Sequence, residues 1–118
     1  MTLKPIGQYW EQQAENFLIQ HGFQLITRNF STPPGEIDLI IRDADYAAFI
    51  EVRYRGSTRF CAAIHNVTAA KQRKLQRCAA LAVSRQTTWS HHPCRFDVIA
   101  YDAPNGDVEP ELIRAAFD

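Results

Sequence analysis

GEIDLII at residues 35–41 and AFIEVRY at residues 48–54 are the stretches that decide the fold of this chain. Both are rich in β-branched and aromatic residues, a composition that predicts β-strands. Asp43–Tyr46 lies between them and can close a hairpin with Ala44 and Asp45 as a two-residue loop. Charged residues in the middle of such apolar strands are unusual, because an ionised group loses several kcal/mol of hydration when it is buried. These residues are therefore candidates for function.

The register of the hairpin brings two acids together. With a two-residue loop, the numbers of paired residues sum to 89, so Asp38 faces Glu51 and Glu36 faces Arg53. Directly opposed side chains share a face, with Cβ atoms about 4.5–5.5 Å apart. A loop longer by one residue would put the two acids on opposite faces. Ala44-Asp45 is also not a strong type I′ turn pair.

Two carboxylates at this distance repel each other unless a proton or a cation lies between them. Mg²⁺ is suited to such a position, because it prefers oxygen ligands and often uses only one or two protein carboxylates. The sequence therefore predicts that Asp38 and Glu51 bind Mg²⁺ or Mn²⁺. The structural alternative is that both acids are tied to backbone amides or to Arg53.

The rest of the chain predicts one α/β domain over residues 1–118, in the order α-β-β-β-α-β, with a mixed sheet flanked by helices. A short closing element at Leu112–Phe117 can be either helix or strand. We expect the other elements at these positions: a helix from about Ile6 to His21, strands at Phe23–Phe30 and Cys94–Tyr101, a helix at Val67–Arg85, turns at Ser31–Gly35 and Pro104–Asp107, and loops at Arg55–Asn66 and Gln86–Pro93.

Composition agrees with a compact cytoplasmic protein. The chain has 118 residues, of which 46% are hydrophobic, and this excludes a disordered chain. It contains no apolar run long enough to span a membrane and no apolar segment of signal-peptide length near Met1. The three cysteines form no Cys-X-X-Cys motif, which favours reduced thiols.

The charges are segregated although the net charge is zero. Between Val52 and Phe96 there is no Asp or Glu, while nine of the thirteen basic residues lie there. This pattern predicts a positive surface beside an acidic centre, as binding of a phosphate backbone next to a metal requires. The alternative is a solvated helix face whose charges pair with acids elsewhere.

Asp38 followed by Glu51-Val52-Arg53 resembles the acidic core of the PD-(D/E)XK nucleases, in which an Asp precedes a Glu-X-Lys on the next strand. The whole chain resembles the YraN-like family of small bacterial proteins, which are similar to archaeal Holliday junction resolvases. The matching segments are Gly7, Glu11 and Ala14, Gly22-Phe23, Arg28-Asn29, Gly35–Ile40, Phe49–Arg53, Val67 through Lys71 to Leu75, Arg95–Val98, and Ala116-Phe117.

The resemblance implies a restriction-endonuclease-like fold and a catalytic set. That set comprises Asp38, Glu51, Arg53 and, close to the metal, Glu11. On sequence alone Glu11 is a solvated flank of the apolar stripe of its helix. Arg53 departs from the nuclease pattern, because it keeps the positive charge of the usual lysine but stays protonated and cannot act as a base. Five further basic residues are candidates for binding backbone phosphates: Arg55, Arg59, Lys71, Arg73 and Lys74.

Two classes of function follow. In the first, the protein is a metal-dependent DNA endonuclease, and the resolvase resemblance implies a branched substrate and a homodimer that makes two cuts. In the second, the fold is kept without activity, as a module that binds nucleic acid or protein. Metal affinity distinguishes the two classes.

Overall fold

The computed structural model describes residues 5–33, 35–55, 68–85, 93–102 and 109–117. Within these residues, two helices and five strands follow one another in the order α-β-β-β-α-β-β. Their bounds are α1 Pro5–Gln20, β1 Gln24–Thr32, β2 Gly35–Asp43, β3 Tyr46–Arg55, α3 Ala69–Arg85, β4 Cys94–Asp102 and β5 Glu111–Phe117.

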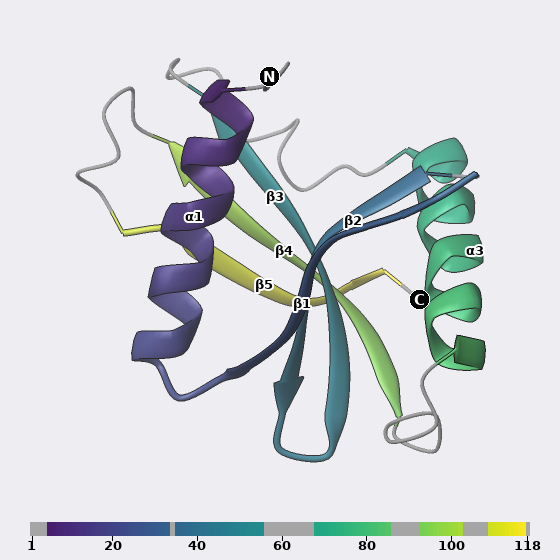
Figure 1. Cartoon of the computed structure of the whole chain (residues 1–118). Helices are drawn as coiled ribbons and strands as arrows, with labels where there is room; N and C mark the ends of the chain where they lie inside the picture. The colour runs from purple at the N-terminus through teal and green to yellow at the C-terminus, as the bar shows by residue number, and fades with distance from the viewer. Residues whose placement is uncertain (1–4, 34, 56–67, 86–92, 103–108, 118) are drawn as a thin grey trace.

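The five strands form one mixed sheet in the order β1-β2-β3-β4-β5. Only β3 and β4 are parallel, and α3 lies between them in the chain, as a parallel connection requires. Helices α1 and α3 lie on opposite sides of the sheet (Figure 1). This architecture confirms the predicted fold class and is compatible with a restriction-endonuclease-like fold. The closing element of undetermined type is the edge strand β5.

Helix α1 ends where Gly22 predicts it. Gly22 has a φ of 89°, a left-handed conformation that glycine adopts without steric cost. The Gly22 amide donates to the Ile19 carbonyl, and the Phe23 amide donates to the Leu18 carbonyl. These two hydrogen bonds are the pair that defines a Schellman motif. This stop turns the chain back into β1.

Helix α3 begins at Ala69, two residues after the predicted Val67. Thr68 precedes it, and its hydroxyl accepts a hydrogen bond from the amide of Lys71 (3.2 Å). A threonine before the first turn satisfies one of the amides that has no partner within the helix. The cap therefore places Lys71 in the first turn of α3.

The central hairpin has the predicted register. The β2–β3 pairs run from Asp43–Tyr46 to Leu39–Ile50, so the numbers of each pair sum to 89. Ala44 and Asp45 form the loop, and of these two only Ala44 has a positive φ, 54°. A type I′ turn requires a positive φ at both positions, so this loop is a different two-residue turn that closes the same register.

Each face of the sheet has its own hydrophobic core. Toward α3 the core contains Ile40 and Phe49, and toward α1 it contains Leu39 and Ile41. Strict alternation along β2 would also point Ile37 toward α1, but Ile37 packs in the core on the α3 side. Strand β2 is therefore twisted between Ile37 and Leu39, at Asp38.

A buried network joins the hairpin to the last two strands. Asp97 is fully buried and accepts hydrogen bonds from Arg95 Nε (3.0 Å) and from the Ala115 amide (2.9 Å). Arg95 also bonds Asp43 at 2.6 Å. Asp97 is thus a structural acid, and the network stabilises the hairpin end of the sheet.

The strands β1 and β4 are slightly longer than predicted, and β1 extends to Thr32. The predicted loops at Arg55–Asn66 and Gln86–Pro93 and the turn at Pro104–Asp107 lie almost entirely outside the described residues. Cys78 and Cys94 are free thiols. Within the described ranges, no helix is long and apolar enough to cross a membrane.

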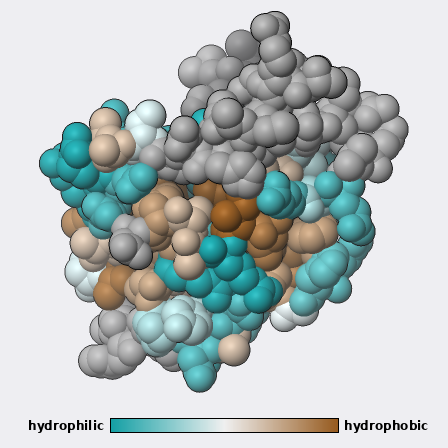
Figure 2. Space-filling view, turned by 180° about the vertical axis from the view of Figure 1, so that it is seen from behind, coloured by the Kyte–Doolittle hydropathy of each residue, from teal (hydrophilic) through white to brown (hydrophobic). Residues whose placement is uncertain are grey.

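The surface seen from behind is mixed in character. Figure 2 shows hydrophobic residues gathered near the middle of this face, with hydrophilic residues on both sides of them. Among the described residues, the exposed large apolar side chains include Tyr9, Ile19, Tyr46 and Tyr54. Single exposed apolar residues of this kind are common on soluble proteins.

The loop of the hairpin generates a stability prediction. Ala44 pays a steric cost for its positive φ, whereas asparagine visits this conformation more readily. We expect Ala44→Asn to raise the free energy of unfolding by about 0.5–1 kcal/mol, measured by urea denaturation. Asp45→Asn is the control, since Asp45 is exposed and lacks a positive φ. A destabilised Ala44→Asn variant would contradict the turn geometry.

Candidate functional site

Strands β2 and β3 separate beyond Leu39 and Ile50, and we call this place the strand fork. In Figure 1, β2 leans from there toward α3 while β3 continues on the other side. At the strand fork the Val52 amide donates to Asp38 Oδ2 (2.8 Å). The Asp38 side chain thus replaces a carbonyl of the ladder. Asp38 and Glu51 were expected to pair directly, but the β2–β3 ladder ends one step earlier, at Leu39 and Ile50.

Three carboxylates converge near the strand fork. Glu11 of α1 and Glu36 and Asp38 of β2 each offer an oxygen, and these oxygens lie within 4.8 Å of one another. We call this group the acidic triad. All three side chains belong to partly buried residues. Ser31 on β1 donates to Glu36 Oε2 (3.2 Å) and helps to orient it.

The acidic triad has the donor chemistry of a magnesium or manganese site. Carboxylate oxygens are the ligands that Mg²⁺ prefers, at about 2.1 Å in octahedral geometry, so two of its oxygens lie about 3 Å apart when adjacent and about 4.2 Å apart when opposite. The oxygens of the acidic triad lie within 4.8 Å of one another, so the side chains would draw together around the ion. The residues present therefore fit a hard divalent cation.

Burial and crowding change the acidity of Asp38. Burial raises its pKa most, the negative charge of Glu51 adds to this effect, and Glu11 and Glu36 contribute further. The hydrogen bond from Val52 opposes them, and the resulting pKa is about 8. A bound cation would offset the same repulsion.

Glu51 lies near the acidic triad and forms an ion pair with a lysine of α3. Its Oε2 is 3.5 Å from Lys71 Nζ, and the side chain of Glu51 is 12% exposed. Lys71 reaches it from the first turn of α3, on the face opposite α1. The negative charge of Glu51 acts on Asp38 and helps to raise the pKa of that carboxyl, and the ion pair with Lys71 connects Glu51 to α3.

The other predicted residues fall into two groups. Arg53 is two residues beyond Glu51 on β3 and therefore shares its face of the sheet. Arg73 and Lys74 are exposed on α3, which carries no acidic residue. Arg55 is the last residue of β3, and Arg59 lies outside the described residues.

Arg95 does not belong to the predicted positive surface. Its side chain is only 13% exposed and is paired with Asp43 and Asp97. Its guanidinium also lies over the ring of Tyr46. Asp97 is two residues away on the same strand, whereas Asp43 comes from β2, a partner that the local sequence does not indicate.

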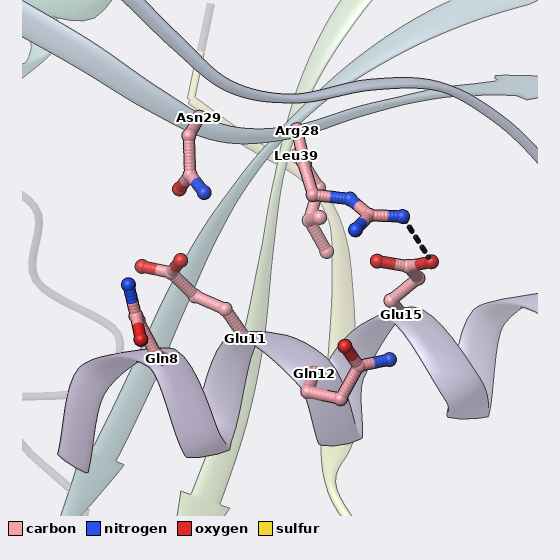
Figure 3. A pocket seen from close by; sticks show the side chains of 7 residues that line it. All are labelled: Gln8, Glu11, Gln12, Glu15, Arg28, Asn29 and Leu39. Atoms are coloured by element: carbon pink, nitrogen blue, oxygen red, sulfur yellow. Dashed lines mark hydrogen bonds and ion pairs between the residues drawn. The ribbon is translucent and has the colours of Figure 1, made fainter. Parts of the chain in front are cut away.

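A pocket adjoins the acidic triad on the α1 side (Figure 3). It holds about 200 Å³ and lies between α1 and β1, with Leu39 of β2 in its wall. Glu11 belongs to both the pocket and the acidic triad. Figure 3 shows Glu11 and Asn29 pointing toward one another, with Gln8 beside Glu11. We call this cavity the α1–β1 pocket.

Sequence reasoning missed Glu36 as a member of the site and missed the pocket entirely. Glu36 and Asp38 are two residues apart on one strand, a spacing that puts both on the same face, so this signal was available. The expected pairing of Glu36 with Arg53 assumed that the ladder continues past Leu39. Glu15 is buried and forms a 2.9 Å ion pair with Arg28 of β1. No local sequence pattern indicates this partner.

The acidity of Asp38 generates a prediction about pH. Its pKa is 3.8 in an ordinary environment and about 8 in the folded protein. Between these values the folded state holds a proton that the unfolded state has lost, so stability falls as the pH rises from about 4 to about 8. Asn cannot ionise and can still accept the Val52 hydrogen bond. Asp38→Asn should therefore melt at a higher temperature than wild type at pH 9 and differ much less at pH 5.

Thermal melts in EDTA measure the difference in melting temperature between the variant and wild type. In Mg²⁺ this difference should be smaller, because the cation stabilises the complete set of carboxylates, which only wild type has. Asp45→Asn is the matched control, since Asp45 is an exposed acid at the opposite end of the hairpin. If the melting temperatures of Asp38→Asn and wild type differ by the same amount from pH 5 to pH 9, the pKa of Asp38 is not raised by its surroundings.

Comparisons with known proteins give the family. The sequence model described as "Uncharacterised protein family UPF0102" matches residues 10–101. A UPF0102 protein of Pseudomonas syringae pv. syringae is 40% identical over 118 residues, covering 99% of this chain and 96% of its own. UPF0102 proteins of Pseudomonas fluorescens and Stutzerimonas stutzeri are also 40% identical, over 113 and 111 residues, covering 95% and 91% of this chain and 92% of each relative. The acidic triad and Glu51 all lie within the residues that the family model matches, and the chain belongs to the UPF0102 family.

Proposed function

We propose that this protein is a DNA endonuclease that uses a divalent metal, with Mg²⁺ or Mn²⁺ held at the acidic triad. The observation that supports this most directly is the convergence of Glu11, Glu36 and Asp38 at the strand fork. A partly buried Asp whose pKa is raised by burial and then by neighbouring carboxylates is typical of a functional site. The resemblance to the PD-(D/E)XK nucleases adds Glu51 as a further ligand.

The chemistry needs a metal and at least one protein cation. A bound Mg²⁺ lowers the pKa of a water molecule and offsets charge on a phosphate. Asp38 and Glu51 would hold the ion, with Glu11 and Glu36 completing the negative site. The charge of Arg53, on the same face as Glu51, would stabilise the scissile phosphate.

Among the described residues, Lys71 is a cation that forms an ion pair with one of the predicted metal ligands, Glu51. Its Nζ is 3.5 Å from Glu51, and its side chain is 43% exposed, so it reaches both the carboxylate and the solvent side. Lysine can orient a water molecule and exchange a proton, whereas arginine stays protonated. We assign to Lys71 the role that the motif lysine has in the nuclease pattern, where this chain has Arg53.

The exposed residues Arg73 and Lys74 continue the positive charge along α3 and would contact backbone phosphates. Arg55 and Arg59 follow β3 in sequence and would extend these contacts. A branched substrate and a homodimer follow from the resolvase resemblance, because resolution of a junction needs two cuts.

Cleavage of labelled DNA tests the proposal. Linear, flapped and four-way DNA are incubated with Mg²⁺ or Mn²⁺ and, in parallel, with EDTA. We expect cleavage that requires the metal, and a loss of at least about a hundredfold in Asp38→Asn, because a metal ligand contributes several kcal/mol of charge stabilisation. Asp45→Asn should cleave like wild type.

Metal binding is measured separately by calorimetry with Mn²⁺. If wild type binds no Mn²⁺ and cuts none of the DNAs, the proposal is wrong. If it binds DNA under those conditions, the protein is instead a nuclease fold that acts as a binding module.

The role of Lys71 is tested by moving the lysine. Lys71→Ala should lower kcat by about a hundredfold, at the lower end of the range for a positioned proton-transfer group. Arg53→Lys alone should maintain or raise cleavage. Adding Arg53→Lys to Lys71→Ala should restore at least about tenfold of the lost rate, because the lysine returns to the position of the motif.

Lys74→Ala is the comparison on the same helix. As a phosphate contact it should raise KM and leave kcat near wild type, because phosphate contacts contribute mainly to binding. Equal effects of Lys71→Ala and Lys74→Ala on KM, with kcat unchanged in both, would show that Lys71 only binds the backbone.

A further inference from the structure

The α1–β1 pocket is a second site next to the acidic triad, and its position relates it to the same substrate. Glu11 forms part of both. Asn29, on the β1 side of the pocket, lies across from Asp38, because its neighbours Arg28 and Phe30 pair with Leu39 and Ile37. A group bound in this pocket would therefore lie next to Asp38, one of the predicted metal ligands.

The charge in the pocket is largely compensated. Glu15 is buried in the wall and is neutralised by Arg28 through a 2.9 Å ion pair. The other acid, Glu11, is itself a member of the acidic triad, where a bound cation would offset its charge. With the metal in place the pocket is close to neutral, which disfavours a phosphate as its occupant.

The walls are suited to a planar, uncharged group that forms hydrogen bonds. Gln8 and Asn29 carry amides, which provide both donors and acceptors. Leu39 provides an apolar contact, and the guanidinium of Arg28, which is 56% exposed, is a flat surface that can stack. The volume of about 200 Å³ is below the range of about 300–1,000 Å³ for drug-sized ligands, so one small ring system fits.

We infer that the α1–β1 pocket binds a single unpaired nucleobase of the DNA whose backbone lies at the acidic triad. A nucleobase is planar and uncharged, and its edge presents donors and acceptors of the kind that Asn and Gln recognise. This inference rests on the proposed function, since the occupant is part of the DNA substrate.

The inference defines a substrate class. Bases inside a duplex are stacked and paired, and extracting one costs a few kcal/mol. A nucleotide that is already unpaired, at a bulge, flap or junction, avoids this cost. The pocket therefore favours DNA with an unpaired nucleotide next to the phosphate that would be cut.

Three DNA duplexes of the same sequence test the pocket: fully paired, with one unpaired nucleotide, and with an abasic residue in place of that nucleotide. Binding to full-length protein is measured by fluorescence anisotropy at one salt concentration with Mg²⁺, and the DNA length is checked on a gel afterwards. We expect wild type to bind the unpaired nucleotide about tenfold more tightly than the abasic duplex, as one base contact provides. The abasic DNA has the same phosphates and the same flexibility, so this comparison isolates the base.

The double variant Gln8→Ala, Asn29→Gly should lose this tenfold preference and bind the fully paired duplex like wild type. Glycine at position 29 tolerates the φ of 52° that Asn29 has, so the backbone is preserved. Gln20→Ala, an exposed glutamine of α1 outside the pocket, is the matched control and should keep the preference.

Equal affinity of wild type for the unpaired and abasic DNAs would overturn the inference, as would a double variant that keeps the preference. The Mn²⁺ calorimetry of the double variant should match wild type, which separates loss of the pocket from loss of the metal site. The nuclease proposal fails independently if the protein cleaves none of the DNAs but still prefers the duplex with the unpaired nucleotide.

Discussion

The hydrogen bond from the Val52 amide to the Asp38 carboxylate is the interaction on which the site depends. Beyond Leu39 and Ile50, β2 and β3 no longer pair through their backbones. A backbone amide that loses its partner inside a protein costs about as much as a lost hydrogen bond. Asp38 supplies the missing acceptor at 2.8 Å, so β3 can continue while β2 turns toward α3. One carboxylate thus holds the strand fork open and is itself placed at its centre.

The strand fork explains how side chains from both faces of the sheet meet. A continuous sheet separates the α1 side from the α3 side, and the two hydrophobic cores remain separate. Where β2 and β3 part, Glu11 of α1 reaches Asp38 and Glu36 from one side. Lys71 of α3 reaches Glu51 from the other. Negative charge is thereby concentrated between two helices, and only one of them, α3, is purely basic. That arrangement is suited to holding a cation beside a phosphate backbone.

The opposite end of the hairpin shows what charged groups do when they serve only the fold. Asp97 is fully buried, but Arg95 and the Ala115 amide satisfy it. Its charge is paired within the chain, and Asp43 and Arg114 extend the pairing. Burial raises the pKa of both Asp97 and Asp38. At the strand fork the neighbouring carboxylates raise the pKa of Asp38 further, whereas Arg95 and Arg114 lower that of Asp97. The same residue type is thus affected in opposite directions by its charged neighbours, according to their sign.

The sequence by itself determined the hairpin register, the fold class and most of the elements, but left the closing element open between helix and strand. What it determined follows from short-range physics: strand-forming composition at GEIDLII and AFIEVRY, a two-residue loop between Asp43 and Tyr46, and a glycine stop at Gly22. It also indicated Asp38 and Glu51 as unusual, because acids in apolar strands violate the pattern. Only the tertiary structure decided that the ladder ends at Leu39, that Glu36 joins Glu11 and Asp38, and that Lys71 contacts Glu51. These contacts depend on the twist of β2 and on where two helices lie against the sheet, which long-range packing sets and no local pattern encodes.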